Sequence, residues 1–184
     1  MWGPIGERQF EFLVEQGLEP EHQLLDVGCG SLRAGLHFIR YLDAGHYCGI
    51  EANDDILRGG HIELRNAGLV EKRPVLIRDE QFGFGAFQRT FDFALAQSVF
   101  THLPFNPIVR CLREIERVLV PGGRFYATIN ETDERLGITD KDPFFYEPEI
   151  FRWLVEGSRL EFEYIGLWGH PRGSHPMLLF TKRG

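Results

Sequence analysis

The chain has 184 residues, 43% of them hydrophobic and 13% aromatic, which predicts one compact domain over residues 1–184 with a sizeable core. The net charge of -7 argues against nucleic acid as a partner, because a nucleic-acid-binding face is usually basic. Three scattered cysteines favour neither a disulfide framework nor a metal site, so we expect no metal and a reducing compartment. No stretch approaches the roughly 18 apolar residues of a membrane span, so we expect a soluble, cytoplasmic protein that binds no membrane.

The first predicted element is a short helix within residues 1–20. Its apolar residues recur at helical spacing and are Ile5, Phe10, Leu13 and Val14. The pattern ends at Gly17, as helices commonly end at a glycine. This helix either lies over a ligand cleft as a lid or packs on a sheet, and residues 21–184 form the core.

Residues 24–35, LLDVGCGSLRAG, carry the most informative pattern. The apolar residues around Asp26 predict a strand that is buried on both faces and ends at Gly28. Gly28 and Gly30 can adopt a positive φ and let the backbone approach a ligand closely, and Ser31 can cap a following helix. Open α/β sheets bind nucleotides with such a unit, at the carboxyl end of the first strand.

The glycine spacing bears on which nucleotide binds. A dinucleotide fingerprint has its third glycine three residues after Gly30, but this chain has Arg33 there and its next glycine at Gly35. The turn therefore resembles that of the class I, Rossmann-like methyltransferases that depend on S-adenosylmethionine (SAM). The cofactor-binding residues that this resemblance implies here are Asp26, Gly28, Cys29, Gly30 and Gly35.

Carboxylates follow the second and third predicted strands. Glu51 ends a strand over residues 46–51, about twenty residues after the glycine turn, where a carboxylate can accept hydrogen bonds from both ribose hydroxyls. NAD sites and SAM sites share this feature, so Glu51 indicates an adenosine ligand without naming it. A third strand over 75–77 precedes Asp79 and Glu80, and the resemblance implies that these residues lie at the adenine.

A fourth buried strand over residues 91–97 ends in polar residues. The run SVFTHLP, residues 98–104, resembles the family's segment at this place, which implies that Gln97 and Ser98 lie beside the methionine part of the cofactor. His102 is the candidate catalytic base, because imidazole titrates near neutral pH. The other interpretation is that His102 only caps or packs at the start of the next helix.

That helix is predicted over residues 105–120, and Pro121-Gly122-Gly123 then turns the chain into a fifth strand, as is typical of the family. The long segment 131–148 leaves the same sheet edge as the cofactor turn. The residues that we expect to line or cover an acceptor pocket are Asn130, Glu131, Phe144, Phe145 and Tyr146. A helix over 149–156 precedes a final antiparallel hairpin.

Four motifs occur in the family's order, and together they imply a fold and an activity. The implied fold is a doubly wound α/β domain with a mostly parallel seven-stranded sheet of order 3-2-1-4-5-7-6, its last strand antiparallel and helices on both faces. The implied reaction is in-line transfer of a methyl group from SAM to a nucleophile, which leaves S-adenosylhomocysteine (SAH). The acidic composition favours a small-molecule acceptor. Two alternatives stay open: a SAM-binding regulatory protein without turnover, and an NAD-dependent oxidoreductase.

Overall fold

The structure is a computed structural model that describes residues 2–132, 142–170 and 175–184. Its helices and strands are, in chain order, α1 (Trp2–Glu15), β1 (Leu24–Val27), α2 (Gly35–Tyr41), β2 (Tyr47–Glu51), α3 (Asp54–Asn66), β3 (Val75–Arg78), β4 (Phe91–Ala96), α4 (Phe105–Val118), β5 (Leu119–Thr128), β6 (Asn130–Glu131), β7 (Phe145–Tyr146), α5 (Ile150–Leu154), β8 (Leu160–Gly166) and β9 (Met177–Lys182). The short 3-10 helices are η1 (Val70–Lys72), η2 (Phe84–Phe87) and η3 (Phe100–His102). None of the helices in these ranges is long and apolar enough to span a membrane.

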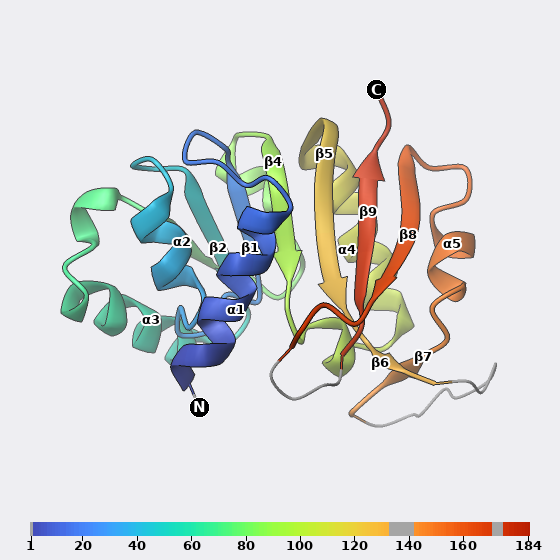
Figure 1. Ribbon diagram of the computed structural model, residues 1–184, viewed down its shortest axis with the longest axis horizontal. Helices are drawn as coiled ribbons and strands as arrows, with labels where there is room; N and C mark the ends of the chain where they lie inside the picture. The colour runs from blue at the N-terminus through green and yellow to red at the C-terminus, as the bar shows by residue number, and fades with distance from the viewer. Residues whose placement is uncertain (1, 133–141, 171–174) are drawn as a thin grey trace.

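Seven strands form one sheet in the order β3-β2-β1-β4-β5-β9-β8 (Figure 1). The strands from β3 to β5 pair in parallel, and β9 pairs antiparallel with both β5 and β8. Apart from the short β6-β7 ladder, this is the predicted order 3-2-1-4-5-7-6, which is confirmed. The carboxyl ends of β1 and β4 are neighbours at the point where the strand order reverses, and ligands of such sheets bind there.

Neighbouring residues of each strand point to opposite faces of the sheet. Because both faces carry apolar side chains, helices cover both of them. Leu24 is buried in a layer with α1, α2 and α3, which includes Phe38. Leu25 is buried in the opposite layer with α4 and α5, which includes Ile108 and Phe151. Both faces of β1 are therefore buried, as its continuous apolar run predicts.

The structure corrects two local predictions. Ser31 does not cap a helix, because Leu32 adopts a φ of +65° and α2 begins only at Gly35, with no side-chain cap. The Pro121-Gly122-Gly123 turn lies inside β5 and not before it, at a place where the pairing with β4 shifts register. In both cases the element begins at a residue other than the one that the sequence pattern indicated.

Candidate cofactor-binding site

The turn after β1 holds two glycines in left-handed conformations, with φ of +71° at Gly28 and +57° at Gly30. A Cβ atom on Gly28 would lie 2.5 Å from Cγ2 of Val99, so Gly28 lets the turn pack against the segment after β4. Apart from Gly30 and its two chain neighbours, no atom of the described residues lies within 4 Å of the Cβ position of Gly30. Gly30 therefore presents bare backbone to open space, where a ligand can approach it closely.

Glu51, at the end of β2, fixes this turn. Its Oε2 atom accepts a hydrogen bond from the backbone N–H of Gly30 at 3.1 Å, and its Oε1 atom accepts one from the N–H of Asn53 at 2.9 Å. A carboxylate has about four lone-pair positions, so these two bonds leave Glu51 with capacity for further donors. The carboxylate thus holds the turn and can still accept hydrogen bonds from a ligand.

Asp26 is buried beneath the turn, with 5% of its surface exposed. The hydroxyl of Tyr47 donates a hydrogen bond to its Oδ2 atom at 2.6 Å. Burial raises the pKa of Asp26 to about 6, the Tyr47 hydrogen bond opposes this rise, and the charge of Glu51 adds to it. Gly35 lies behind the turn, where a Cβ atom would be 2.6 Å from the Tyr47 oxygen. Gly35 therefore shapes the site by leaving room for this hydroxyl.

A cavity of about 210 Å³ lies beside the turn. Its lining residues come from α1, the turn, α3 and the end of β4, and are Gln9, Asp26, Gly28, Cys29, Gly30, Ser31, Arg33, Ala34, Ile56 and Gln97. Two polar atoms of these residues, Gln9 Nε2 and Gln97 Oε1, are buried without a hydrogen-bond partner in the described part of the chain. Because buried polar atoms are nearly always paired in folded proteins, the two atoms are available to a polar ligand or to ordered water in this cavity.

Gln9 is a lining residue that the sequence analysis missed. It lies one turn after Ile5 and one turn before Leu13, so it occupies the buried face of α1. A polar residue at such an apolar position is the signal that could have identified it. Helix α1 therefore packs on the core and also contributes Gln9 to the lining of the cavity, whereas a function as a lid stays a prediction.

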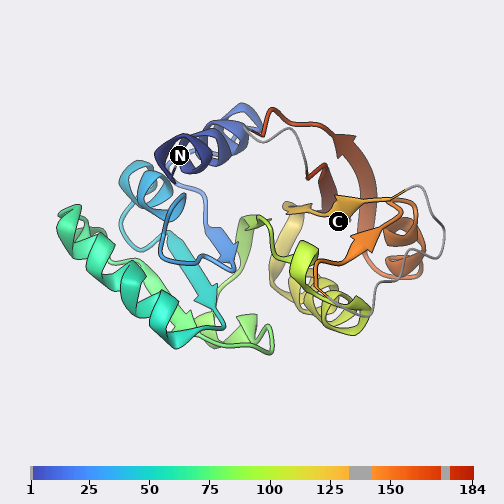
Figure 2. The same cartoon turned by 90° about the horizontal axis from the view of Figure 1, so that it is seen from below.

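Contacts at both ends hold α1 over this side of the sheet. Near its start, Gly6 packs so closely on the glycine turn that a Cβ atom would lie 2.3 Å from the carbonyl oxygen of Arg33. Further along, the Arg8 guanidinium donates to the carbonyl of Trp168 at 3.0 Å, and the ring of Phe12 packs on the Trp168 ring. Figure 2 shows α1 reaching from α2 to the segment that follows β8. Helix α1 thus connects the glycine turn to the segment that follows β8, the edge strand of the sheet.

The predicted adenine residues lie after β3. Asp79 accepts hydrogen bonds from the backbone N–H groups of Gln81 and Gly83, so it orders the loop. Glu80 is exposed and pairs with Arg78 at 3.5 Å. A second cavity, of about 260 Å³, is lined by Glu80, Gln81, Phe82, Asn106, Pro107 and Arg110. The structure therefore brings five of the predicted cofactor residues to the cavity at the glycine turn (Asp26, Gly28, Cys29, Gly30 and Gln97) and one, Glu80, to the second cavity, whereas Gly35, Glu51, Asp79 and Ser98 line neither.

Ser98 and His102 follow β4. Ser98 adopts a φ of +55°, and its N–H donates to the hydroxyl of Thr128 at 2.8 Å. His102 Nδ1 lies 2.7 Å from Oδ1 of Asp142, and about 60% of each of these two side chains is exposed. His102 lines neither of the two cavities. Asp142 is a partner that no sequence pattern indicates, since it is forty residues away.

The candidate acceptor residues join β6 to the residue before β7, and β7 to the segment after β4. Asn130 donates from its side chain to the carbonyl of Phe144 at 2.9 Å, and Tyr146 donates from its hydroxyl to the carbonyl of Leu103. Phe145 is partly exposed, and Glu131 accepts a hydrogen bond from Tyr164. Residues 133–141 of the predicted acceptor segment lie outside the described residues.

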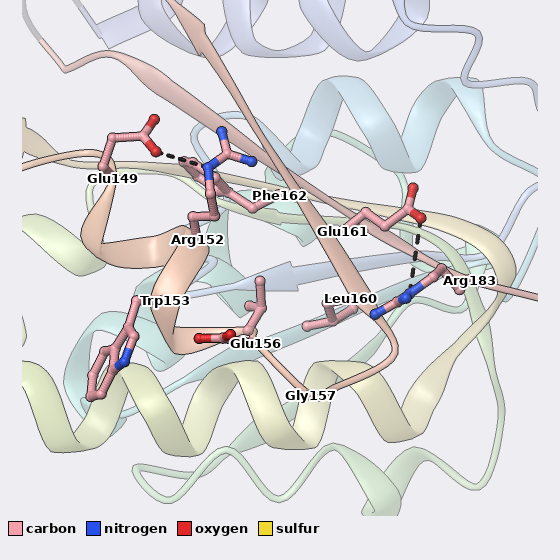
Figure 3. Close-up of a pocket in the computed structure, with 10 residues that line it drawn as sticks. Glu149, Arg152, Trp153, Glu156, Gly157, Leu160, Glu161, Phe162 and Arg183 are labelled. Atoms are coloured by element: carbon pink, nitrogen blue, oxygen red, sulfur yellow. Dashed lines mark hydrogen bonds and ion pairs between the residues drawn. The ribbon is translucent and has the colours of Figure 1, made fainter.

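A wider groove of about 720 Å³ lies between α5 and β8 (Figure 3). Figure 3 shows Arg152 turned toward Glu149 and Arg183 toward Glu161, at N–O distances of 2.8 and 3.9 Å. These charges already pair with one another, and the groove lies at the β8 edge of the sheet, away from β1. The glycine turn is therefore the better candidate site.

The fold and the turn define a Rossmann-like α/β protein with a nucleotide-type site at the switch between β1 and β4. Residues 25–125 match the model of a family described as "Methyltransferase domain", and the chain belongs to this family. The predicted methyltransferase class is thereby confirmed.

Individual relatives agree with this assignment. The chain is 30% identical over 117 residues to an uncharacterized methyltransferase of Schizosaccharomyces pombe, a match that covers 60% of this chain and only 40% of that protein. A SAM-dependent methyltransferase from Clostridium acetobutylicum is similar in structure, with a TM-score of 0.77 at 13% identity over 97% of this chain and 92% of that chain. Magnesium protoporphyrin IX methyltransferase from Synechocystis with bound SAM has a TM-score of 0.73 at 13% identity, over 97% and 80% of the two chains.

Proposed function

We propose that this protein transfers a methyl group from SAM to a nucleophile on a small-molecule acceptor and releases SAH. The observation that carries the proposal is the cavity at the glycine turn, where Asp26 and two unpaired amide atoms meet bare backbone. The SAM-dependent class of the structural relatives, one of which contains bound SAM, supports this choice of cofactor.

The residues at the turn fit this cofactor chemically. Gly30 leaves open space for a close approach, and Glu51 retains acceptor capacity for ribose hydroxyls. Asp26 provides an anion next to a ligand that carries a cationic sulfur and an ammonium group. The residues that we assign to the cofactor are Asp26, Gly28, Cys29, Gly30, Glu51, Asp79, Glu80, Gln97 and Ser98, with Gly35 acting through Tyr47.

Bound SAM supplies a methyl group that its cationic sulfur has already activated. The chain therefore needs mainly to position the acceptor, and good alignment of reactants lowers a barrier by up to about 7 to 11 kcal/mol. When the His102 Nδ1–H donates to Asp142, the Nε2 atom of His102 is left to accept a proton from the acceptor. A general base of this kind contributes about 10² to 10⁴ in rate.

A SAM-binding regulatory protein without turnover is the second candidate. It is favoured by one observation, namely that His102 lines neither of the two cavities described above. An NAD-dependent oxidoreductase is disfavoured by Arg33 at the place of the third glycine.

The experiment that tests the function is a transfer assay with methyl-labelled SAM and separate small-metabolite, protein and RNA fractions of a cell extract, in which Glu51→Ala serves as the control. Label that appears in a small molecule with the wild-type protein, and at a much lower rate with the variant, supports the proposal. Label that appears only in protein or RNA contradicts the small-molecule acceptor. SAH binding without any transfer favours the regulatory protein.

A further inference from the structure

Gln9 is a buried residue with an unpaired hydrogen-bond donor in its side chain. Only 4% of the residue is exposed, and Nε2 has no hydrogen-bond partner within the described ranges. Leaving a buried donor unpaired costs about 1–3 kcal/mol, so a donor in this position calls for an acceptor that the chain itself does not supply. Because Gln9 lines the cavity at the glycine turn, a ligand in the cavity can supply that acceptor.

A second unpaired atom in the same cavity has the opposite polarity. Gln97 donates from Nε2 to the hydroxyl of Ser98 at 3.2 Å, which leaves its Oε1 atom as a buried acceptor without a partner. The carboxylate of Asp26 is a second acceptor in this cavity. Among the buried side-chain atoms described here, Gln9 Nε2 is thus an unpaired donor and Gln97 Oε1 and the Asp26 carboxylate are acceptors, which is the polarity that a zwitterion of one carboxylate and one ammonium group requires.

The order of the strands orients the ligand along the sheet edge. Glu51 and Asp79 end β2 and follow β3, on one side of β1, whereas Gln97 follows β4 on the other. A ligand whose ribose lies at Glu51 and whose adenine lies toward β3 must extend its remaining end toward β4. The amino-acid end of the cofactor therefore reaches the cavity that holds Gln9 and Gln97.

We propose that Gln9 donates a hydrogen bond to the α-carboxylate of the cofactor, and that Gln97 Oε1 and Asp26 accept from its ammonium group. This inference rests on the proposed function. It makes α1 a part of the cofactor site and not only a cover over it. Since the same helix also packs on the glycine turn and on Trp168, ligand binding at Gln9 ties these segments together.

The test compares two ligands by calorimetric titration of the full chain. SAH carries the amino-acid end, and 5′-methylthioadenosine has the same adenosine without it. Gln9→Leu removes the donor at similar volume, and we expect its SAH affinity to fall about tenfold or more while its methylthioadenosine affinity stays unchanged. Glu7→Gln, on the exposed face of the same helix, is the matched control and leaves both affinities unchanged.

The melting temperature of the ligand-free protein supplies an independent readout. Gln9→Leu replaces a buried amide whose Nε2 atom is unpaired by an apolar group, so we expect its melting temperature to equal or exceed that of the wild type. Gln9→Glu keeps the shape but places a negative charge near the ligand carboxylate, so we expect a larger loss of SAH affinity than for Gln9→Leu.

Three outcomes overturn the inference. An unchanged SAH affinity in Gln9→Leu and Gln9→Glu excludes the contact. An equal loss for both ligands assigns Gln9 to the adenosine part or to general packing. A wild-type protein that binds neither ligand contradicts the proposed function itself, and this result is distinct from the other two.

Discussion

The hydroxyl of Tyr47 donates a 2.6 Å hydrogen bond to Oδ2 of Asp26, and both residues are buried beneath the glycine turn. The bond joins the first residue of β2 to β1, and the absent side chain of Gly35 makes room for it. It supplies a donor to a carboxyl group that burial otherwise isolates. The position and the protonation of Asp26 at the candidate site therefore depend on Tyr47.

Replacing Tyr47 tests this dependence. We expect Tyr47→Phe to lower the free energy of unfolding by about 1–3 kcal/mol, because the buried carboxyl group of Asp26 loses its donor. Urea denaturation measures the change. Tyr164→Phe is the matched control, because its hydroxyl bonds to the exposed carboxylate of Glu131, and we expect it to cost much less. Equal losses in the two variants would mean that the Tyr47 bond has no special role.

The raised pKa of Asp26 predicts a pH dependence of stability. Its pKa of about 6 in the folded protein exceeds its ordinary value of 3.8, so the folded state binds this proton more tightly than the unfolded state. Protonated Asp26 therefore stabilises the folded state, and this contribution to the unfolding free energy is fully present below about pH 4 and is lost as the pH rises through about 6. Asp26→Asn removes this contribution, and the difference between wild type and variant in unfolding free energy should decline over that window. A difference that is constant between pH 4 and 7 would contradict the raised pKa.

Gly30 tests whether a ligand approaches the turn closely. We expect Gly30→Ala to fold with about 1–2 kcal/mol of backbone strain and to lose about tenfold or more in SAH affinity, since its methyl group enters the open space beside the turn. Gly68 has a φ of +66° and equally open surroundings, but lies after α3 away from the cavity. Gly68→Ala should therefore show the same strain and normal SAH affinity. Equal affinities in the two variants would place the ligand elsewhere.

His102 and Asp142 are predicted to act as a pair. Once an acceptor is known, His102→Ala should lower kcat about 10² to 10⁴-fold at saturating SAM, while SAH affinity stays unchanged. Asp142→Asn should lower kcat less and alter its pH profile, because it removes the group that orients the imidazole. Near-normal kcat in His102→Ala would leave the residue with a purely structural role.

Much of the fold could be predicted because its determinants are local. The apolar run around Asp26, the glycine turn and the strand-helix alternation predict the sheet, and the family resemblance adds the strand order. The start of α2 could not be predicted, because Ser31 is a good cap by residue type and only packing holds Leu32 in a left-handed conformation.

The candidate site, too, could be predicted from the sequence only where local motifs determine it. Gly28, Gly30 and Gln97 lie within or next to recognisable motifs, and the structure brings them to one cavity. Gln9 reaches the cavity, and Asp142 reaches His102, from distant parts of the chain. Such contacts depend on tertiary structure that no local pattern encodes.

The most direct measurement of the central claim is a calorimetric titration of SAH and of NAD into the wild-type protein and into Glu51→Ala. We predict that SAH binds the wild type at one site per chain, that Glu51→Ala weakens this binding severalfold or more, and that NAD gives no heat of binding. Binding of NAD without SAH, or an SAH affinity that Glu51→Ala leaves unchanged, would contradict the assignment of the cofactor to the glycine turn.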